Sequence, residues 1–295
     1  MKIFVTGATG FIGSRIVKEL VQAGHQVIGL TRSETGAQSL AAAHAEVHRG
    51  TLEDLESLRS GAAKADGVIH CAFDHDFSNF VANCEKDQRA IEALGDALVG
   101  SNRPLVITSG TGMGSRGPGE LATEDSFDEH HPNPRIASEY AGIAVTKRGV
   151  NVSVVRLPQV HDTFKQGLIS PLIEIAREKK ISAYVGEGLN RWPAAHVLDV
   201  ARLYKLAIEK AQPGSRYHAV AEEGISVREV AEVIGMGLKV PVVSLSLGEA
   251  KTHFGWLGMF VHFDMPASSQ LTRKWLSWNP TGPGLISDLK QMNYV

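Results

Sequence analysis

Cysteine is scarce in this chain: there are only two, Cys71 and Cys84, and they do not form a CxxC motif. This argues against a cysteine-pair redox or metal-binding motif. Cys71 lies in the apolar run Gly67–Phe73, where we interpret it as a buried free thiol. Unpaired thiols are typical of reducing compartments, so we expect a cytoplasmic protein.

An excess of basic charge, a long hydrophobic run and an N-terminal leader are also missing. The formal net charge is -2, so no basic field favours nucleic acid or an anionic membrane surface as a partner. No apolar run approaches the length of a membrane span. Met1 leads directly into the apolar segment Lys2–Gly7, without the regions of a signal peptide. We therefore expect a soluble protein that binds neither nucleic acid nor membrane.

Short apolar runs rich in β-branched residues alternate with helical patterns through the first half of the chain. The predicted strands are residues 2–7, 25–32, 46–50, 67–73, 104–110 and 151–158, and the predicted helices include 10–24, 85–101 and 137–149. Such alternation indicates parallel strands with right-handed crossovers, hence an α/β fold with a doubly wound parallel sheet, the Rossmann fold. We predict a dinucleotide-binding core over residues 1–160. We also predict a smaller, partly interleaved lobe over residues 161–295 that mainly binds the substrate. Within it, the segment around residues 193–212 is expected to pack back on the core.

A glycine-rich segment, TGATGFIG, joins the first predicted strand to the first predicted helix at Thr6–Gly13. In a dinucleotide-binding turn, Gly7 allows the tight turn, Gly10 lets the backbone approach a pyrophosphate, and Gly13 lets the helix pack on the strand. The phosphates lie at the helix N-terminus, where free N–H groups and the helix dipole favour anions. The segment therefore predicts a dinucleotide site, whose other members here are Thr9, Phe11 and Ile12.

The end of the second predicted strand indicates which dinucleotide binds. NAD binding favours an acidic residue there for the ribose 2′-hydroxyl, whereas NADP binding favours a cation for the 2′-phosphate. This chain has Thr31, Arg32 and Ser33, with no acid before Glu34. Because Arg32 can form a forked, charge-assisted bond with a phosphate, we predict NADP(H) as the cofactor.

The N-terminal motif resembles that of the short-chain dehydrogenase/reductase superfamily, in its extended, epimerase/dehydratase-like branch. The resemblance continues along the chain in RGTLEDLESL, VIHCAF, RLPQVHD, AAHVLDVARLYKLAIEK and WLSWNPTGPGLISDL. It implies that Thr51 and Leu52 flank the adenine, although the family usually has Asp in place of Thr51. It also implies that four further residues lie beside the cofactor, namely Ala72, Phe73, Pro158 and Val160.

The catalytic set of this superfamily is Ser or Thr, Tyr, and Lys four residues after the Tyr. Ser109 follows the predicted strand 104–110 in the register of the catalytic serine, and Thr111 is a second candidate. The segment RIASE fits the register of the Tyr–Lys pair, which places Arg135 at the tyrosine position and Glu139 at the lysine position. The chain thus resembles an atypical subgroup that keeps the cofactor fold without this pair.

Two readings of Arg135 and Glu139 follow from their spacing. Residues four apart on a helix can form a surface ion pair with each other. Alternatively, Glu139 accepts hydrogen bonds from the ribose and Arg135 faces the substrate pocket, where a permanent cation stabilises an oxyanion but does not donate a proton. The proton then comes from water, from Tyr140 or from a histidine.

Two histidines are candidates for the substrate pocket, His75 in a loop after a predicted strand and His161 after the strand 151–158. Open α/β sheets bind ligands at the carboxyl ends of their strands, where both residues are expected. His70, Cys71, Asp74 and Asp76 surround His75 and are suitable metal ligands by type. Because alternate strand residues face opposite ways, we predict no metal site.

The leading functional hypothesis is an NADP(H)-dependent oxidoreductase that reduces a carbonyl or conjugated double bond of a small organic substrate, with Ser109 polarising the substrate oxygen. The alternative is a non-catalytic NADP-binding sensor or regulator. A weaker alternative is a sugar-nucleotide epimerase or dehydratase, which needs the missing tyrosine. The resemblance also implies a homodimer formed through the helices at 85–99 and 135–146.

Overall fold

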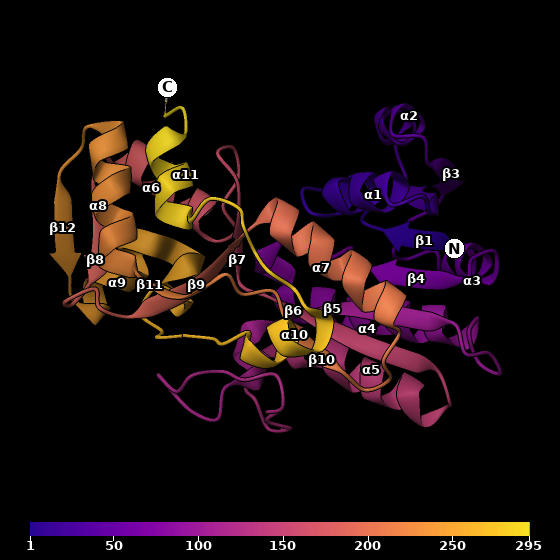
Figure 1. Cartoon of the computed structure of the whole chain (residues 1–295). Coiled ribbons are helices and arrows are strands. Elements are labelled where there is room, and N and C mark those ends of the chain that lie inside the picture. Colours follow the sequence, from indigo (N-terminus) through magenta and orange to yellow (C-terminus); the bar gives the residue numbers. More distant parts are fainter. Residues whose placement is uncertain (295) are drawn as a thin grey trace.

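The computed structural model describes residues 1–294 and contains a seven-stranded sheet in which all paired strands are parallel (Figure 1). The strand order is β10-β6-β5-β4-β1-β2-β3. The strands are β1 (Lys2–Thr6), β2 (Gln26–Thr31), β3 (Glu46–Arg49), β4 (Gly67–His70), β5 (Pro104–Gly110), β6 (Asn151–Leu157) and β10 (Arg216–His218). The prediction of a doubly wound α/β Rossmann fold is confirmed.

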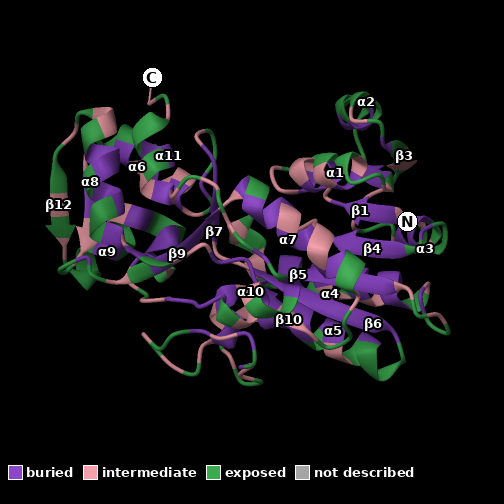
Figure 2. Cartoon of the chain, in the orientation of Figure 1, coloured by how far each residue is buried: buried purple, intermediate pink, exposed green. Residues whose placement is uncertain are grey.

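Two hydrophobic cores form because successive residues of each strand face opposite sides of the sheet. Ile3 and Val5 belong to one core and Phe4 belongs to the other. The first core includes side chains of α1 (Gly13–Gln22), α2 (Glu34–Ala42) and α7 (Val197–Lys210). The second includes side chains of α3 (Leu55–Ala63), α4 (Phe80–Asp96) and α5 (Ala137–Lys147). Figure 2 shows buried central strands between helices whose outer faces are exposed.

The strand order reverses beside β1, which pairs with β2 on one side and with β4 on the other. In open α/β sheets, ligands bind at the carboxyl ends of the strands at such a reversal. The strands β1 and β4 end at Thr6 and His70. We therefore expect a ligand to bind beside the segments that follow these two residues.

The remaining elements form a smaller lobe with its own hydrophobic core, on the left in Figure 1. Its strands are β7 (Gln159–His161), β9 (Arg191–His196) and β11 (Glu222–Ser226) in one sheet, and β8 (Ser182–Val185) with β12 (Val242–Leu245) in another. Its helices are α6 (Ile169–Lys179), α8 (Val227–Leu238), α9 (Leu247–Phe254), the 3-10 helix η4 (Gly255–Met259) and α11 (Leu285–Gln291). No helix of residues 1–294 has the length and apolarity needed to cross a membrane.

The chain crosses between the two parts more than once. After β7 and β9 have entered the lobe, α7 returns to the first core of the large sheet, where Tyr204 is fully buried. β10 then pairs with β6 at the edge of that sheet, and α10 (Gln270–Leu276) packs beside β10 and α7. The predicted domain boundary at residue 160 stays a prediction. The later segments α7, β10 and α10 contact the large sheet or its core, so a single boundary does not separate the two parts.

A buried ion cluster fixes α5 to the edge of the large sheet. Both carboxylate oxygens of Glu139 accept hydrogen bonds from Arg156, at 2.7 and 2.9 Å, and one also accepts a bond from Arg216 at 2.8 Å. Arg156 is fully buried on β6 and donates further to the carbonyls of Thr123 and Ser126. Because a lone buried charge is costly, each member of this cluster depends on its partners.

We predict that Glu139→Gln lowers the free energy of unfolding by about 3 kcal/mol or more, since it leaves the buried Arg156 without its counter-ion. The matched control is Asp96→Asn on α4, whose carboxylate pairs with Arg59 and Arg148 at the surface and should cost less than about 1 kcal/mol. Urea unfolding followed by circular dichroism measures both. Equal losses for the two variants would contradict the prediction.

The same cluster predicts a pH dependence of stability. Burial alone would raise the pKa of Glu139, but the hydrogen bonds and charges of Arg156 and Arg216 outweigh it and lower the pKa. The stabilisation is therefore complete above the unfolded pKa of about 4.3 and is lost as pH falls through the folded pKa. The stability difference between wild type and Glu139→Gln should shrink on acidification below this range and stay constant above it.

Candidate functional site

The glycine-rich turn after β1 has the conformation that a dinucleotide-binding turn needs. Gly7 has a φ of +66°, and a Cβ there would lie 2.8 Å from the backbone nitrogen of Ala72, so the turn contacts the segment after β4. A Cβ on Gly13 would lie 2.0 Å from the carbonyl oxygen of Gly7. At Gly10 a Cβ would meet only the Gly7 carbonyl oxygen, at 3.2 Å. The turn therefore presents bare backbone at the start of α1, which suits a pyrophosphate.

Two cations lie near Phe11 in this turn. The guanidinium carbon of Arg15 is 5.3 Å from the centre of the Phe11 ring, and the Lys165 amine is 6.0 Å from it. Arg15 also pairs with Asp162 at 3.2 Å. Thr9 is exposed, and Ile12 is half-buried immediately before α1. The surroundings of the turn thus add positive charge to the N-terminus of α1, as an anionic ligand requires.

The end of β2 carries the residues predicted to select the cofactor. Arg32 is exposed, and no described residue pairs with its side chain. Ser33 caps α2 by accepting a hydrogen bond from Gly36 at 3.0 Å. Arg49, which the sequence analysis missed, donates to the Ser33 carbonyl at 2.7 Å and pairs with Glu34. The one nearby acid therefore already has a counter-ion, while Arg32 stays available to a ligand.

The remaining predicted adenine-side residues lie along the same edge of the sheet. The Thr31 hydroxyl accepts a hydrogen bond from the Ser33 backbone at 3.4 Å. The Thr51 hydroxyl accepts a bond from the Asp54 backbone at 3.3 Å, and Leu52 packs against the second core. None of these contacts tests whether adenine binds there, so their role stays a prediction.

A buried chain of hydrogen bonds starts at the end of β1 and crosses to α4. The Thr6 hydroxyl lies 2.7 Å from Nδ1 of His70, and Nε2 of His70 lies 3.0 Å from a carboxylate oxygen of Asp87. These side chains are at most 1% exposed. The other carboxylate oxygen of Asp87 accepts bonds from Arg135 and Ser138, both at 2.6 Å. Asp87 thus connects α4 to the ends of β1 and β4 and to the start of α5.

Arg135 is fixed at the carboxyl ends of β4 and β5. Its guanidinium donates to Asp87 and, at 3.0 Å, to the carbonyl of Thr108. The guanidinium carbon lies 4.1 Å from the centre of the Phe73 ring. Burial would raise the pKa of Asp87, but the Arg135 charge and the His70 and Ser138 hydrogen bonds lower it well below its usual range. Asp87 is therefore an anion that keeps a permanent cation beside Phe73.

An ion pair between Arg135 and Glu139, one of the two readings of their spacing, is absent, because each side chain has another partner. Arg135 pairs with Asp87, and Glu139 lies in the cluster with Arg156 and Arg216. Both carboxylate oxygens of Glu139 are occupied and the side chain is 1% exposed. We therefore no longer propose that Glu139 binds the ribose.

Tyr140 lies on the outer side of α5. Its hydroxyl donates to the carbonyl of Glu129, its ring packs edge-on against Phe127, and the residue is 42% exposed. The hydroxyl therefore already has a hydrogen-bond partner within the chain. A role of Tyr140 as proton donor stays a prediction.

Ser109 has a buried hydroxyl without a hydrogen-bond partner in the described part of the chain. Its neighbour Thr108 faces the first core, where its hydroxyl bonds to Tyr204 at 2.6 Å. Strand alternation directs Ser109 to the opposite face, the side of α4 and α5. Thr111 is buried at the start of the 3-10 helix η2 (Thr111–Gly114). A buried, unsatisfied hydroxyl is uncommon in a folded protein and calls for an explanation.

The loop after β4 is ordered by its own acids and does not form a metal cluster. Asp74 pairs with Lys86 at 2.8 Å, and Asp76 caps the 3-10 helix η1 (Phe77–Asn79). His75 is exposed, with its ring 5.3 Å from that of Phe73. Within residues 1–294, no group of three potential ligands is arranged to bind a metal. His75 thus lies next to Phe73, and its role in a substrate pocket stays a prediction.

His161 lies at the junction with the small lobe. It is fully buried on β7, and its Nδ1 is 2.7 Å from a carboxylate oxygen of Asp288 on α11. Burial lowers the pKa of His161 despite this acid. The preceding Val160 is buried in the first core and pairs in register with Ala195, and Pro158 is half-buried. The observed partner of His161 is thus the C-terminal helix, so its predicted role in the substrate pocket is left untested.

Asp87 is a second residue of the candidate site that sequence reasoning missed, although a signal was present. The buried side of α4 carries Asn83, Asp87, Ala90, Ile91 and Leu94, at helical spacing. An acid on an apolar helix stripe is seldom buried without a partner. The pattern therefore indicated a buried cation or histidine elsewhere in the chain, but not which one.

Comparisons with known proteins agree with this architecture. The model of the NAD dependent epimerase/dehydratase family matches residues 3–220. An uncharacterized protein of Schizosaccharomyces pombe is 48% identical over 295 residues, with 100% of both chains covered. A 4-hydroxy-2-methyl-3-oxo-4-farnesyl-3,4-dihydroquinoline-1-oxide ketoreductase of Stigmatella aurantiaca is 26% identical over 288 residues, covering 86% of this chain and 80% of its own.

A solved structure gives the same result for the fold. The dTDP-glucose 4,6-dehydratase of Streptomyces venezuelae, with NAD and TYD bound, superposes with a TM-score of 0.79 at 18% identity and covers 99% of this chain and 95% of its own. The family match spans most of the chain, including the glycine-rich turn, β4 and β5. This chain belongs to the NAD-dependent epimerase/dehydratase family.

Proposed function

We propose that the protein is an NADP(H)-dependent oxidoreductase that reduces a carbonyl group or a conjugated double bond of a small organic substrate. One observation carries the proposal: the Arg135 guanidinium is bound to the Thr108 carbonyl, one residue before the buried, unpaired hydroxyl of Ser109. A fixed cation and an unused hydroxyl at the end of a strand suit an oxygen that gains negative charge. The bare backbone at Gly10 and the N-terminus of α1 are the groups that would hold the cofactor.

When bound, NADPH would supply a hydride to the substrate carbon and leave as NADP⁺. Ser109 would donate a hydrogen bond to the substrate oxygen, and Arg135 would stabilise the negative charge that forms there. Arg135 keeps its own proton, because a guanidinium stays charged in proteins. The balancing proton then comes from solvent and completes the alcohol or the saturated carbonyl compound.

Asp87 makes this arrangement possible because its carboxylate, on α4, forms an ion pair with the Arg135 guanidinium. Its carboxylate holds the guanidinium on the Phe73 ring, so the cation does not have to reorganise as charge develops on the substrate. Reduction of a conjugated double bond needs only a stabilised enolate oxygen in this step. Such a reaction therefore tolerates the lack of a tyrosine better than epimerisation or dehydration of a sugar nucleotide.

A non-catalytic NADP-binding sensor is the second candidate. It is favoured by the engagement of the Tyr140 hydroxyl with the Glu129 carbonyl, because this candidate proton donor already has a partner within the chain. A screen of ketones and enones that follows the absorbance of NADPH separates the two candidates. Turnover of any substrate supports the enzyme, and tight NADPH binding without turnover across the screen supports the sensor.

For the cofactor, we expect tighter binding of NADPH than of NADH, because Arg32 is exposed and Glu34 is paired with Arg49. One charge-assisted phosphate bond contributes about 1.5–3 kcal/mol, which corresponds to about tenfold or more in affinity. Calorimetric titration of wild type and Arg32→Ala with both cofactors measures this. Arg59→Ala, on the exposed face of α3, is the control; a preference that survives Arg32→Ala would refute the assignment.

For the reaction, we expect Ser109→Ala to lower turnover by roughly 100-fold, the loss typical of one oxyanion donor, with little change in NADPH affinity. Thr111→Val tests the second candidate, since it removes a buried hydroxyl two residues away. Steady-state kinetics and a cofactor titration measure both variants. If Thr111→Val were inactive and Ser109→Ala unaffected, the two roles would have to be exchanged.

A further inference from the structure

Five aromatic side chains form a continuous wall between the reaction centre and the small lobe. Only 6% of the chain is Phe, Trp or Tyr. The five rings come from two segments that are far apart in sequence and meet in the folded chain. The aromatic wall consists of Phe73, Phe77 and Phe80 from the segment after β4, and Trp256 and Phe260 from η4 and the residue that follows it.

The ring geometry makes the wall continuous. Phe77 stacks on Trp256 with ring centres 4.3 Å apart and an angle of 8° between the planes. Phe260 meets both of these rings edge-on, at 6.4 and 6.3 Å. Phe80 connects Phe77 to Phe73, at 5.6 and 6.2 Å. The Arg135 guanidinium lies over the Phe73 ring. The wall therefore begins at the proposed oxyanion site and ends on the small lobe.

None of the five rings is fully buried. Trp256 is 38% exposed, the four Phe side chains are half-buried, and Phe260 packs against the core of the small lobe. Exposed apolar side chains continue nearby in the sequence: Met259 is 53% exposed and Phe263 is 48% exposed. Contacting aromatic rings that stay partly accessible beside the candidate site indicate a site for an apolar ligand.

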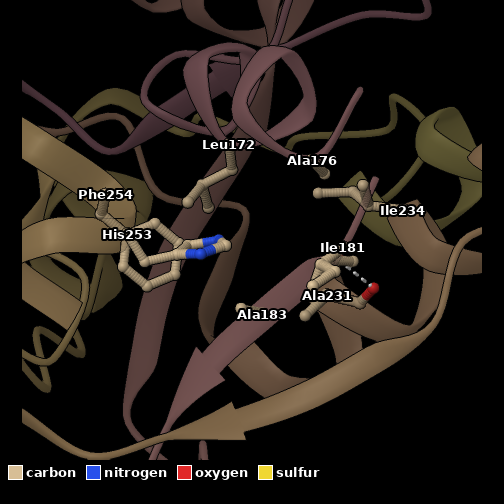
Figure 3. A pocket seen from close by; sticks show the side chains of 9 residues that line it. Leu172, Ala176, Ile181, Ala183, Ala231, Ile234, His253 and Phe254 are labelled. Atoms are coloured by element: carbon tan, nitrogen blue, oxygen red, sulfur yellow. Dashed lines mark hydrogen bonds between the residues drawn. The ribbon is translucent and has the colours of Figure 1, made fainter. Parts of the chain in front are cut away.

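The small cavity inside the lobe does not offer an alternative site. It measures about 10 Å³ and lies among apolar side chains of α6, β8 and α8 with His253 at its side (Figure 3). That is room for a single water molecule. The aromatic wall is therefore a better candidate than this cavity for the part of the site that selects the substrate.

We propose that the aromatic wall binds the substrate, and that the substrate is a planar aromatic or conjugated carbonyl compound rather than a sugar nucleotide. This inference rests on the proposed oxidoreductase function. A planar ring can stack on Trp256 or meet the Phe edges while its carbonyl oxygen reaches Ser109 and Arg135. A sugar would instead need several hydrogen-bonding groups, and the four Phe rings offer none.

The test compares two enones that share the reactive group and differ only in a ring: 4-phenyl-3-buten-2-one and 3-penten-2-one. Calorimetry measures their binding to the protein loaded with NADP⁺, which cannot reduce them. Wild type should bind the phenyl compound about tenfold or more tightly than the aliphatic one. Trp256→Leu keeps apolar volume but removes the ring, so it should abolish most of this preference and leave NADP⁺ affinity unchanged.

Trp275→Leu is the matched control, because Trp275 is 41% exposed on α10 and its ring contacts Tyr217, outside the wall. It should leave the preference unchanged. If the wall only attaches the lobe to the core, Trp256→Leu would lower the melting temperature and weaken both enones equally, which would overturn the inference. Lack of any preference in wild type would overturn it as well.

The two proposals fail in different ways. Selective binding of the phenyl compound without turnover by the NADPH-loaded protein would remove the proposed reaction and keep the aromatic site. Turnover of aliphatic carbonyl compounds with no aromatic preference would keep the reaction and remove the aromatic site. Phe77→Leu provides a second test of the wall from the side of the core, should Trp256→Leu fail to fold.

Discussion

The buried carboxylate of Asp87 is the contact on which the rest of the candidate site depends. It has no solvent to balance its charge, so it requires His70, Ser138 and Arg135 together. Through these partners one helix side chain joins the ends of β1 and β4 to the start of α5. Removing it would leave the Arg135 cation without its counter-ion and the Thr6–His70 hydrogen bond without its anchor. The geometry at the carboxyl edge of the sheet is therefore a consequence of one buried charge.

This arrangement changes what chemistry the site can support. A guanidinium at the end of β5 offers fixed positive charge but no transferable proton, in contrast to a tyrosine whose pKa is lowered by a lysine. On the proposed function, the site would therefore stabilise an oxyanion and take its proton from water. Partly exposed aromatic rings that extend from Phe73 towards the small lobe suit a substrate with little hydrogen-bonding capacity. Charge at one end and apolar rings at the other are consistent with a small conjugated carbonyl compound.

Local sequence patterns were sufficient for the fold and for the position of some candidate-site residues within it. The β1 strand, the glycine-rich turn and α1 follow each other within one short segment, so their conformation depends on neighbours in sequence and was predictable. The place of Ser109 at the end of β5 followed in the same way. The partners of Arg135 and Glu139 did not: Asp87 is 48 residues from Arg135, and Arg216 is 77 residues from Glu139. The helical spacing of Arg135 and Glu139 favoured a surface pair that contributes little, and buried partners available only after folding outcompeted it.

A crystal structure of the complex with NADP⁺ and an unreactive aromatic ketone tests the central claim most directly, because it locates the substrate oxygen. The account predicts that Arg135 remains bound to Asp87, that the ketone oxygen lies about 3 Å from Ser109 Oγ or an Arg135 nitrogen, and that the aromatic ring contacts the wall. A ketone oxygen bound by other groups, or an Arg135 side chain that turns away from both Asp87 and the ligand, would contradict it.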